Sequence, residues 1–196
     1  MSPLAAVSMH GKRVSIGPLL PADTSLLFLW RNDACAAKLD FSFRPMDGLA
    51  YARWLARLEN DASTVIFAIR RLNSPQMIGF VGFGDIQNVH RCAELGIRIG
   101  NEVDRGHGYG KEAISLALEY AWRWLNLNRV QLKVFLHNER AIHSYASAGF
   151  EQEGHLRRAA FIDGHWRDVI IMSVLRPETL RQSTDGISSA AISGQN

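Results

Sequence analysis

The chain has 196 residues, of which 47% are hydrophobic and 21% are charged. This length and composition fit one domain that buries a core without disulfides or metal, and they exclude a disordered chain, a coiled coil and a collagen-like repeat. The formal net charge of +3, from 22 basic and 19 acidic side chains, is compatible with an anionic partner but is too small to identify one.

The sequence also predicts a compartment and domain boundaries. Residues 1–12 carry no basic region ahead of an apolar run, so we expect a short leader there and no signal peptide. No stretch approaches the roughly 20 apolar residues of a membrane span, and Cys35 and Cys92 lack metal or CxxC spacing. We therefore expect a cytoplasmic protein with no membrane partner and no metal. We expect its domain over residues 13–177 and a flexible Ser-, Gly- and Gln-rich tail over 178–196.

The first half of the chain predicts helices followed by strands. Apolar residues recur at helical spacing after Asp23, and alternating or short apolar runs lie between clusters of turn residues further on. The expected elements, in chain order, are a strand over 14–19, a helix capped by Asp23, a helix with Leu49, Trp54, Leu55 and Leu58 on its apolar face, and strands over 64–71, 77–83 and 92–100. The turns between these strands predict an antiparallel meander.

The second half predicts helices that alternate with strands. The expected elements are a glycine-rich turn over 105–110, a helix over 111–122, a strand over 130–136, a helix over 138–148, and a hairpin with strands over 150–161 and 166–175. Asp163-Gly164 is suited to the turn of that hairpin. Together with the meander, this order predicts an α/β (α+β) fold, in which helices flank a mixed sheet.

The glycine-rich turn is the strongest local signal for binding. Gly106, Gly108 and Gly110 leave backbone N–H groups uncovered directly before a helix, whose dipole adds positive potential. A phosphate or pyrophosphate is the natural ligand, and Arg105 and Lys111 flank the turn. A Walker loop would need a hydroxyl after Lys111, and a Rossmann fingerprint would need glycine in place of Lys111, so both motifs fail. The alternative is that the glycines serve only the packing of the helix.

A second motif downstream gives the turn a family context. Arg105, Gly108 and Gly110 fit the pattern [Arg/Gln]-x-x-Gly-x-[Gly/Ala], and residues 138–150 fit Asn-x-x-[Ala/Ser]-x-x-x-Tyr-x-x-x-Gly-Phe at every constrained position. The chain resembles the GNAT superfamily of N-acetyltransferases. Residues 75–177 are most similar to the branch of spermidine/spermine N-acetyltransferases and ribosomal-protein N-terminal acetyltransferases. The resemblance implies a mostly antiparallel sheet with splayed central strands, acetyl-CoA as co-substrate, and acetyl transfer to a primary amine by direct attack in a ternary complex.

The resemblance also implies which residues hold acetyl-CoA. The strand segment 98–100 would pair with the pantetheine arm, and an amide near Ile99 would polarise the thioester carbonyl. Amides of the turn would hold the pyrophosphate, and Asn138 would bind the arm or a water. The expected set is Arg98, Ile99, Gly100, Arg105, Gly106, His107, Gly108, Tyr109, Gly110, Lys111, Asn138 and Ser144.

Two residues are the catalytic candidates that the resemblance implies. Tyr145 falls where the family places the proton donor to the leaving thiolate, and the alternative is a packed tyrosine with a structural role. Glu94 lies on a central strand where some members place a carboxylate that deprotonates the amine through water. The alternative for Glu94 is a structural carboxylate or one that forms an ion pair.

The acceptor stays open between a small amine, such as an amino sugar or a polyamine, and a protein N-terminus. Residues 30–32 are more similar to amino-sugar-nucleotide and N-terminal acetyltransferases than to polyamine enzymes. The loop over 39–46 contains Asp40 as its one acid and also Arg44, which makes it a poor site for a polycation. A non-catalytic acyl-CoA-binding regulatory module is the alternative function. No clustered basic stripe is present, so no nucleic-acid partner is expected, and a homo-oligomer is left open.

Overall fold

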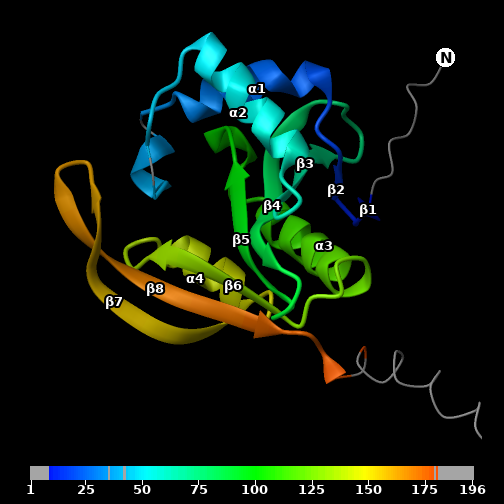
Figure 1. The fold of residues 1–196 in the computed structure, drawn as a ribbon, viewed down its shortest axis with the longest axis vertical. Coiled ribbons are helices and arrows are strands. Elements are labelled where there is room, and N and C mark those ends of the chain that lie inside the picture. The colour runs from blue at the N-terminus through cyan, green and yellow to red at the C-terminus, as the bar shows by residue number, and fades with distance from the viewer. Residues whose placement is uncertain (1–8, 35, 42, 179, 181–196) are drawn as a thin grey trace, which may run out of the picture.

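The computed structural model describes residues 9–34, 36–41, 43–178 and 180. Within this part, eight strands form one sheet in the order β1-β2-β3-β4-β5-β6-β8-β7 (Figure 1). The strands are β1 Met9–His10, β2 Val14–Gly17, β3 Val65–Arg71, β4 Met77–Gln87, β5 Cys92–Ile99, β6 Arg129–Phe135, β7 Glu151–Ile162 and β8 His165–Leu175. All neighbours pair antiparallel except β5 and β6, which are parallel. The predicted mixed, mostly antiparallel sheet is confirmed.

Four α-helices and three short 3₁₀ helices flank the described sheet. They are η1 Pro21–Asp23, α1 Thr24–Arg31, η2 Ala36–Leu39, α2 Gly48–Asn60, η3 Glu102–Asp104, α3 Tyr109–Arg123 and α4 Glu139–Ala146. Asp23 stands at the N-cap position of α1, but its carboxylate accepts from the Leu20 amide and pairs with Arg70 of β3 instead of capping the helix. Leu49 is 66% exposed, so its predicted place on the apolar face of α2 is wrong.

The helices pack against opposite faces of the sheet. Ala68 and Ile69 are consecutive on β3 and belong to different core clusters, so the two clusters lie on the two faces. Apolar residues of α3 recur at helical spacing and are buried against one face, with α4 alongside. On the other face, Leu27 and Trp30 of α1 pack with Tyr51 of α2.

The parallel pair β5 and β6 opens into a gap. Its pairing covers only Cys92–Glu94 with Arg129–Gln131. Beyond Glu94, β5 continues to Ile99 with no partner strand on that side among the described residues, and Figure 1 shows the two strands diverging. This is the splay of central strands that the family resemblance implies.

The ends of the expected domain are only partly described. β1 adds Met9–His10 of the expected leader to the sheet by pairing with β2. Residues 1–8 lie outside the described residues, as does the expected tail apart from Glu178 and Leu180. The boundaries at 13 and 177 stay a prediction. No helix in the described part of the chain is long and apolar enough to span a bilayer.

Candidate functional site

The glycine-rich turn leads from η3 into α3 with its backbone amides uncovered. Gly106 and Gly108 adopt φ of 84° and 78°, a region that glycine occupies without steric strain. The first amide of this region with an internal acceptor is Glu112, which donates to the Gly108 carbonyl at 3.1 Å. The six preceding amides, from Gly106 to Lys111, donate to no acceptor among the described residues. A row of free donors at a helix N-terminus suits an anion with several oxygens.

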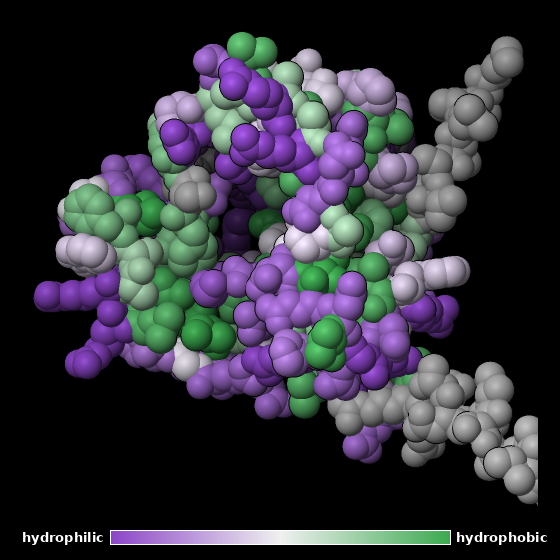
Figure 2. Space-filling model, viewed as in Figure 1, coloured by the Kyte–Doolittle hydropathy of each residue, from purple (hydrophilic) through white to green (hydrophobic). Residues whose placement is uncertain are grey.

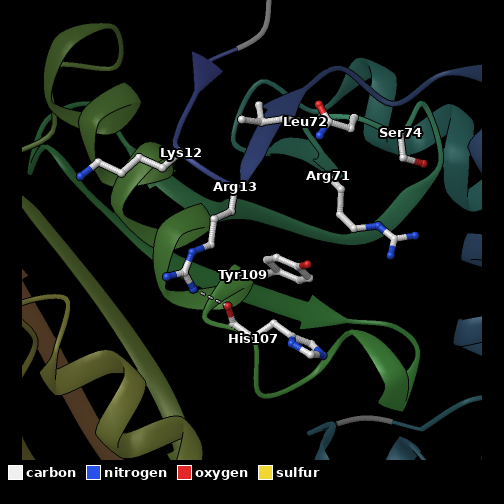
Figure 3. Close-up of a pocket in the computed structure, with 8 residues that line it drawn as sticks. Lys12, Arg13, Arg71, Leu72, Ser74, His107 and Tyr109 are labelled. Atoms are coloured by element: carbon white, nitrogen blue, oxygen red, sulfur yellow. Dashed lines mark hydrogen bonds between the residues drawn. The ribbon is translucent and has the colours of Figure 1, made fainter.

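The hairpin between β1 and β2 holds this turn in place. Arg13 donates from Nη1 to the His107 carbonyl at 2.7 Å, as Figure 3 shows. Glu112, in the first turn of α3, accepts from the Arg13 amide at 3.0 Å and also from the Lys12 amide. A cavity of about 680 Å³ lies beside the turn. Arg13, His107 and Tyr109 line it, and the side chains of Lys12 and Arg71 extend away from one another in Figure 3.

The charged residues that flank the turn differ in their availability. Arg105 donates to the carbonyls of Ile99 at 3.4 Å and Gly100 at 2.9 Å, so its guanidinium secures the end of β5. Lys111 is exposed at the start of α3. His107 contacts the Val103 carbonyl at 3.1 Å through Nε2. The positive potential of the turn therefore rests on its amides and Lys111 more than on Arg105.

The end of β5 presents the backbone of alternate residues to the gap. The Gly100 amide donates to the Ile78 carbonyl of β4 at 2.9 Å. Backbone groups alternate in direction along a strand, so Ile99 directs its N–H away from β4 and toward the gap. The backbone groups of Arg98 and the N–H of Gly100 face β4 for the same reason, whereas the Gly100 carbonyl accepts from Arg105. Of the three strand residues expected to meet pantetheine, Ile99 alone presents an amide there.

Gly100 has a different function, because it lets α1 approach the end of β5. A Cβ at this position would lie 2.0 Å from two atoms of the Trp30 ring. The Trp30 indole, 5% exposed, also lies 3.4 Å from the Asn101 side-chain oxygen through Nε1. Trp30 therefore joins α1 to the strand that borders the gap.

Glu94 lies at the last residue pair before the gap. Its neighbours Ala93 and Leu95 belong to the core beneath α3, so Glu94 points to the other face. Its carboxylate is 2.9 Å from Lys133 Nζ of β6, and both side chains are partly exposed. The expected alternative of an ion pair is thus present, with lysine as the partner.

Tyr145 lies on α4 and packs against the core on the opposite face from Glu94. Its ring meets Phe150 edge-on at 5.9 Å between centroids. Burial raises the pKa of Tyr145 to about 12. The phenol is therefore protonated at neutral pH. Its hydroxyl makes no hydrogen bond to another described residue, which leaves this proton available to an acceptor.

The remaining candidates on α4 hold the helix itself. Asn138 is the N-cap, and its side chain accepts from the Ala141 amide at 3.2 Å. Ser144 donates to the Arg140 carbonyl one turn earlier at 2.9 Å. Among the described residues, no group of three His, Cys, Asp or Glu side chains is placed to hold a metal ion.

Sequence reasoning missed the residues that brace the site. Glu112 carries a signal that could have found it, because an acid in the first turn of a helix is favoured by the helix dipole. Arg13 and Lys133 carry none, since each reaches its partner across strands far apart in sequence.

Comparisons with known proteins agree with this geometry. A family model described as an acetyltransferase (GNAT) domain matches residues 13–151. Spermidine N(1)-acetyltransferase from Vibrio cholerae is 38% identical over 107 residues, which span 55% of this chain and 61% of that protein. The ribosomal protein uS5-alanine N-acetyltransferase of Escherichia coli K12 is 29% identical over 133 residues, 64% of this chain and 68% of that protein. The alignment therefore spans less than two thirds of the Vibrio relative.

Solved structures extend the likeness over more of the chain. The crystal structure of spermidine N-acetyltransferase from Vibrio cholerae in complex with CoA and spermine matches with a TM-score of 0.77 at 28% identity, over 84% of this chain and 96% of that one. A dodecameric structure of the same enzyme matches with a TM-score of 0.74 at 27% identity, over 88% and 99% of the two chains. Because the family model covers most of the described sheet and these structures share its fold, the chain belongs to the acetyltransferase (GNAT) domain family.

Proposed function

We propose that this protein is an N-acetyltransferase that moves an acetyl group from acetyl-CoA to a primary amine. The observation that carries the proposal is the row of free amides from Gly106 to Lys111, next to the unpaired edge of β5. One feature fits a pyrophosphate and the other fits an extended chain with amide groups, and acetyl-CoA carries both groups in one molecule. The relatives named above point to the same co-substrate.

The residues of the site fit acetyl-CoA in three places. The turn offers amide donors without an internal acceptor, which suit the pyrophosphate. The backbone groups of Ile97 and the carbonyl of Ile99 face the gap, where amides of the pantetheine arm would pair with them as a strand does. Lys111 and Arg13, whose guanidinium donates to the His107 carbonyl, supply positive charge at the turn.

Three residues of the chain would assist the transfer. Bound acetyl-CoA supplies a thioester whose carbonyl carbon accepts the amine. The Ile99 amide would donate to the carbonyl oxygen, because its N–H faces the gap. Tyr145 would donate its proton to the departing sulfur. Glu94 would accept a proton from the ammonium group of the acceptor, directly or through water, once its ion pair with Lys133 is broken.

The acceptor and the assembly belong to this proposal as well. One relative is named for spermidine and another for the alanine of a ribosomal protein, so the class of acceptor here is a primary amine of a small molecule or a protein N-terminus. A homo-oligomer is supported by the dodecameric structure of the Vibrio enzyme.

A thiol-release assay over a panel of amines tests the proposal. We expect free CoA to appear only when acetyl-CoA and a suitable amine are both present. Calorimetric titration with acetyl-CoA, without amine, measures binding separately. Tight acetyl-CoA binding with no thiol release for any small amine or peptide N-terminus would replace the proposal with the non-catalytic acyl-CoA-binding module.

A further inference from the structure

A hollow lies over the C-terminal part of β5, on the face opposite α3. Figure 2 shows it between α1 and α2 on one side and β6 and β8 on the other, with hydrophilic atoms at its floor. Gly96 of β5 and Gly84 of β4 lie on the same face as Glu94, and a Cβ at either glycine would meet nothing within 4 Å. The floor therefore has room for a ligand beside the gap.

Arg98 is the cation next to this space. It shares the face of Glu94 four residues along β5, and its side chain is 16% exposed. Its nearest carboxylates are Asp40 at 3.8 Å from Nη1 and Asp33 at 4.0 Å from Nη2. Both distances exceed a hydrogen bond, and Nη2 is buried without a hydrogen-bond partner among the described residues. Arg98 thus forms two long ion pairs and keeps hydrogen-bond donor capacity that neither aspartate uses.

The charges around Arg98 leave a positive balance. Burial lowers its pKa, Asp40 and Asp33 raise it, and repulsion from Arg105 and Arg31 lowers it again. Both aspartates are more than 40% exposed, so water screens them more than it screens Arg98.

Arg31 adds to this balance from α1. Its guanidinium lies 5.1 Å from the centroid of the Trp54 ring, and its Nε is buried without a hydrogen-bond partner in the described part of the chain. The cluster thus holds three guanidinium groups, and the three carboxylates paired with them, Asp33, Asp40 and Glu102, are all more than 40% exposed. Water screens these carboxylates, which favours an anion over a polycation.

We propose that the acceptor is a small amine that also carries a carboxylate or phosphate group, and that Arg98 binds this anion. The planar fork of arginine matches either group with two parallel hydrogen bonds. Ile99, which faces the gap, is the next residue on β5, so the anion would lie only a few bonds from the reacting nitrogen. The inference rests on the proposed acetyltransferase activity and adds the class of acceptor to it.

Matched pairs of amines test the proposal in the thiol-release assay. The pairs are phosphoethanolamine with ethanolamine and glycine with methylamine, and spermidine serves as the polycation. We expect kcat/KM to be at least about tenfold higher for the amine that carries the phosphate or carboxylate than for its partner without that group, since hydrogen bonds to charged groups contribute about 1.5–3 kcal/mol. The pair that shows the preference identifies phosphate or carboxylate. A preference for spermidine, or for the amines without an acidic group, overturns the proposal.

Variants then assign the preference to Arg98. Arg98→Met should bring the ratio of kcat/KM, for the amine with the acidic group over its partner without it, close to one. Arg98→Lys should restore part of this ratio. If Arg98 has only a structural role, its replacement lowers kcat/KM for both amines of a pair to the same extent and leaves the ratio unchanged. That result would contradict the proposal. Asp40→Asn should raise the ratio, because it removes a competing carboxylate. Arg123→Met is the control, since Arg123 pairs with Glu119 on α3 and should leave the ratio unchanged.

Binding measurements separate this inference from the proposed activity. Calorimetry with CoA-loaded protein reports whether each amine binds, whether or not it is acetylated. Binding of phosphoethanolamine or glycine without thiol release would contradict the proposed activity and support the anion site. Equal turnover of amines with and without a carboxylate or phosphate would support the proposed activity and contradict the anion site.

Discussion

The phenol of Tyr145 has its protonation state set by burial. Because burial raises the pKa of Tyr145 to about 12, the proton that transfer needs is still present well into the alkaline range. We expect Tyr145→Phe to lower kcat about 100-fold or more, in the range of a lost general acid. Activity of the unmodified protein should show no loss from ionisation of this group below about pH 11.

A kcat profile over pH for both forms checks this prediction. Tyr120→Phe is the matched control, because Tyr120 lies on α3 and packs edge-on against Phe67 at 4.8 Å. Full turnover by Tyr145→Phe across the pH range would remove Tyr145 from the proton transfer and leave it a packing residue.

Glu94 offers a second prediction at the residue scale, because its carboxylate stands at the mouth of the gap. If it removes the proton of the ammonium, Glu94→Gln lowers kcat/KM about 100-fold near pH 7. The loss should shrink as pH rises, since an amine with a pKa near 10 then arrives already deprotonated. Glu119→Gln is the control, because Glu119 is also a partly exposed carboxylate in an ion pair. A loss of the same size at every pH would assign Glu94 a structural role.

At the scale of elements, the turn before α3 was predictable because its requirements are local. Gly106 and Gly108 need positive φ, and this need is visible in the residue type. The direction of Arg105 was not predictable, since its guanidinium turns back to carbonyls at the end of β5. The sequence predicts Arg105 beside a phosphate site. It does not show that the Ile99 and Gly100 carbonyls lie close enough to accept from its guanidinium. The position of Leu49 was also predicted wrongly, because helical spacing does not show which side of α2 is covered, and Leu49 is 66% exposed.

The turn also gives a prediction in which backbone conformation alone is changed. Gly106→Ala adds a Cβ that meets nothing within 4 Å, so its effect comes from φ of 84°. Left-handed backbone costs a non-glycine residue about 1–2 kcal/mol. We expect the dissociation constant of acetyl-CoA, measured by calorimetry, to rise about 5- to 30-fold as the turn relaxes. Gly48→Ala on α2 also enters open space, has no positive φ, and should leave that constant unchanged. Equal effects of the two changes would contradict the prediction.

The hairpin β7–β8 and strand β6 share a charged clamp that makes stability depend on pH. Glu153 accepts from Arg129 and from Ser173, which lie on the other two strands, and these bonds lower its pKa to about 2. A carboxylate with a depressed pKa contributes stability above its unfolded value near 4.5 and loses it as pH falls toward 2. We therefore expect the unmodified protein to have a higher Tm than Glu153→Gln at pH 7. This difference in Tm should become smaller as the pH is lowered to 3. Glu151→Gln on the same strand is the control. A difference in Tm that stays constant with pH would contradict the role of Glu153.

At the scale of the whole molecule, the sheet consists of two parts joined at one end. β1 to β5 and β6 to β8 meet through three residue pairs at the start of the parallel pair. Across the far end, the segment between α1 and α2 makes the connection, since Phe41 stacks on Phe135 at 4.3 Å and Lys38 pairs with Asp163 at 3.2 Å. The separation of β5 from β6 was predictable only through the family resemblance. No local pattern in either strand indicates the residue at which their pairing ends. The bridging contacts join residues about 90 to 125 positions apart, and no periodicity in the sequence reports them.

A ligand that fills the gap should therefore stabilise the molecule as one unit. Acetyl-CoA at 100 times its dissociation constant adds about 2.7 kcal/mol to the free energy of unfolding, which for a domain of this size raises Tm by roughly 5–10 °C. Hydrogen exchange should slow at Ile97 and Ile99 and through the turn, because these amides acquire acceptors. Adenosine 3′,5′-bisphosphate is the matched probe, since it lacks the pantetheine arm and cannot pair with β5. It should protect neither isoleucine, and protection of both by this probe would show that the two parts of the sheet close without a strand-like ligand between them.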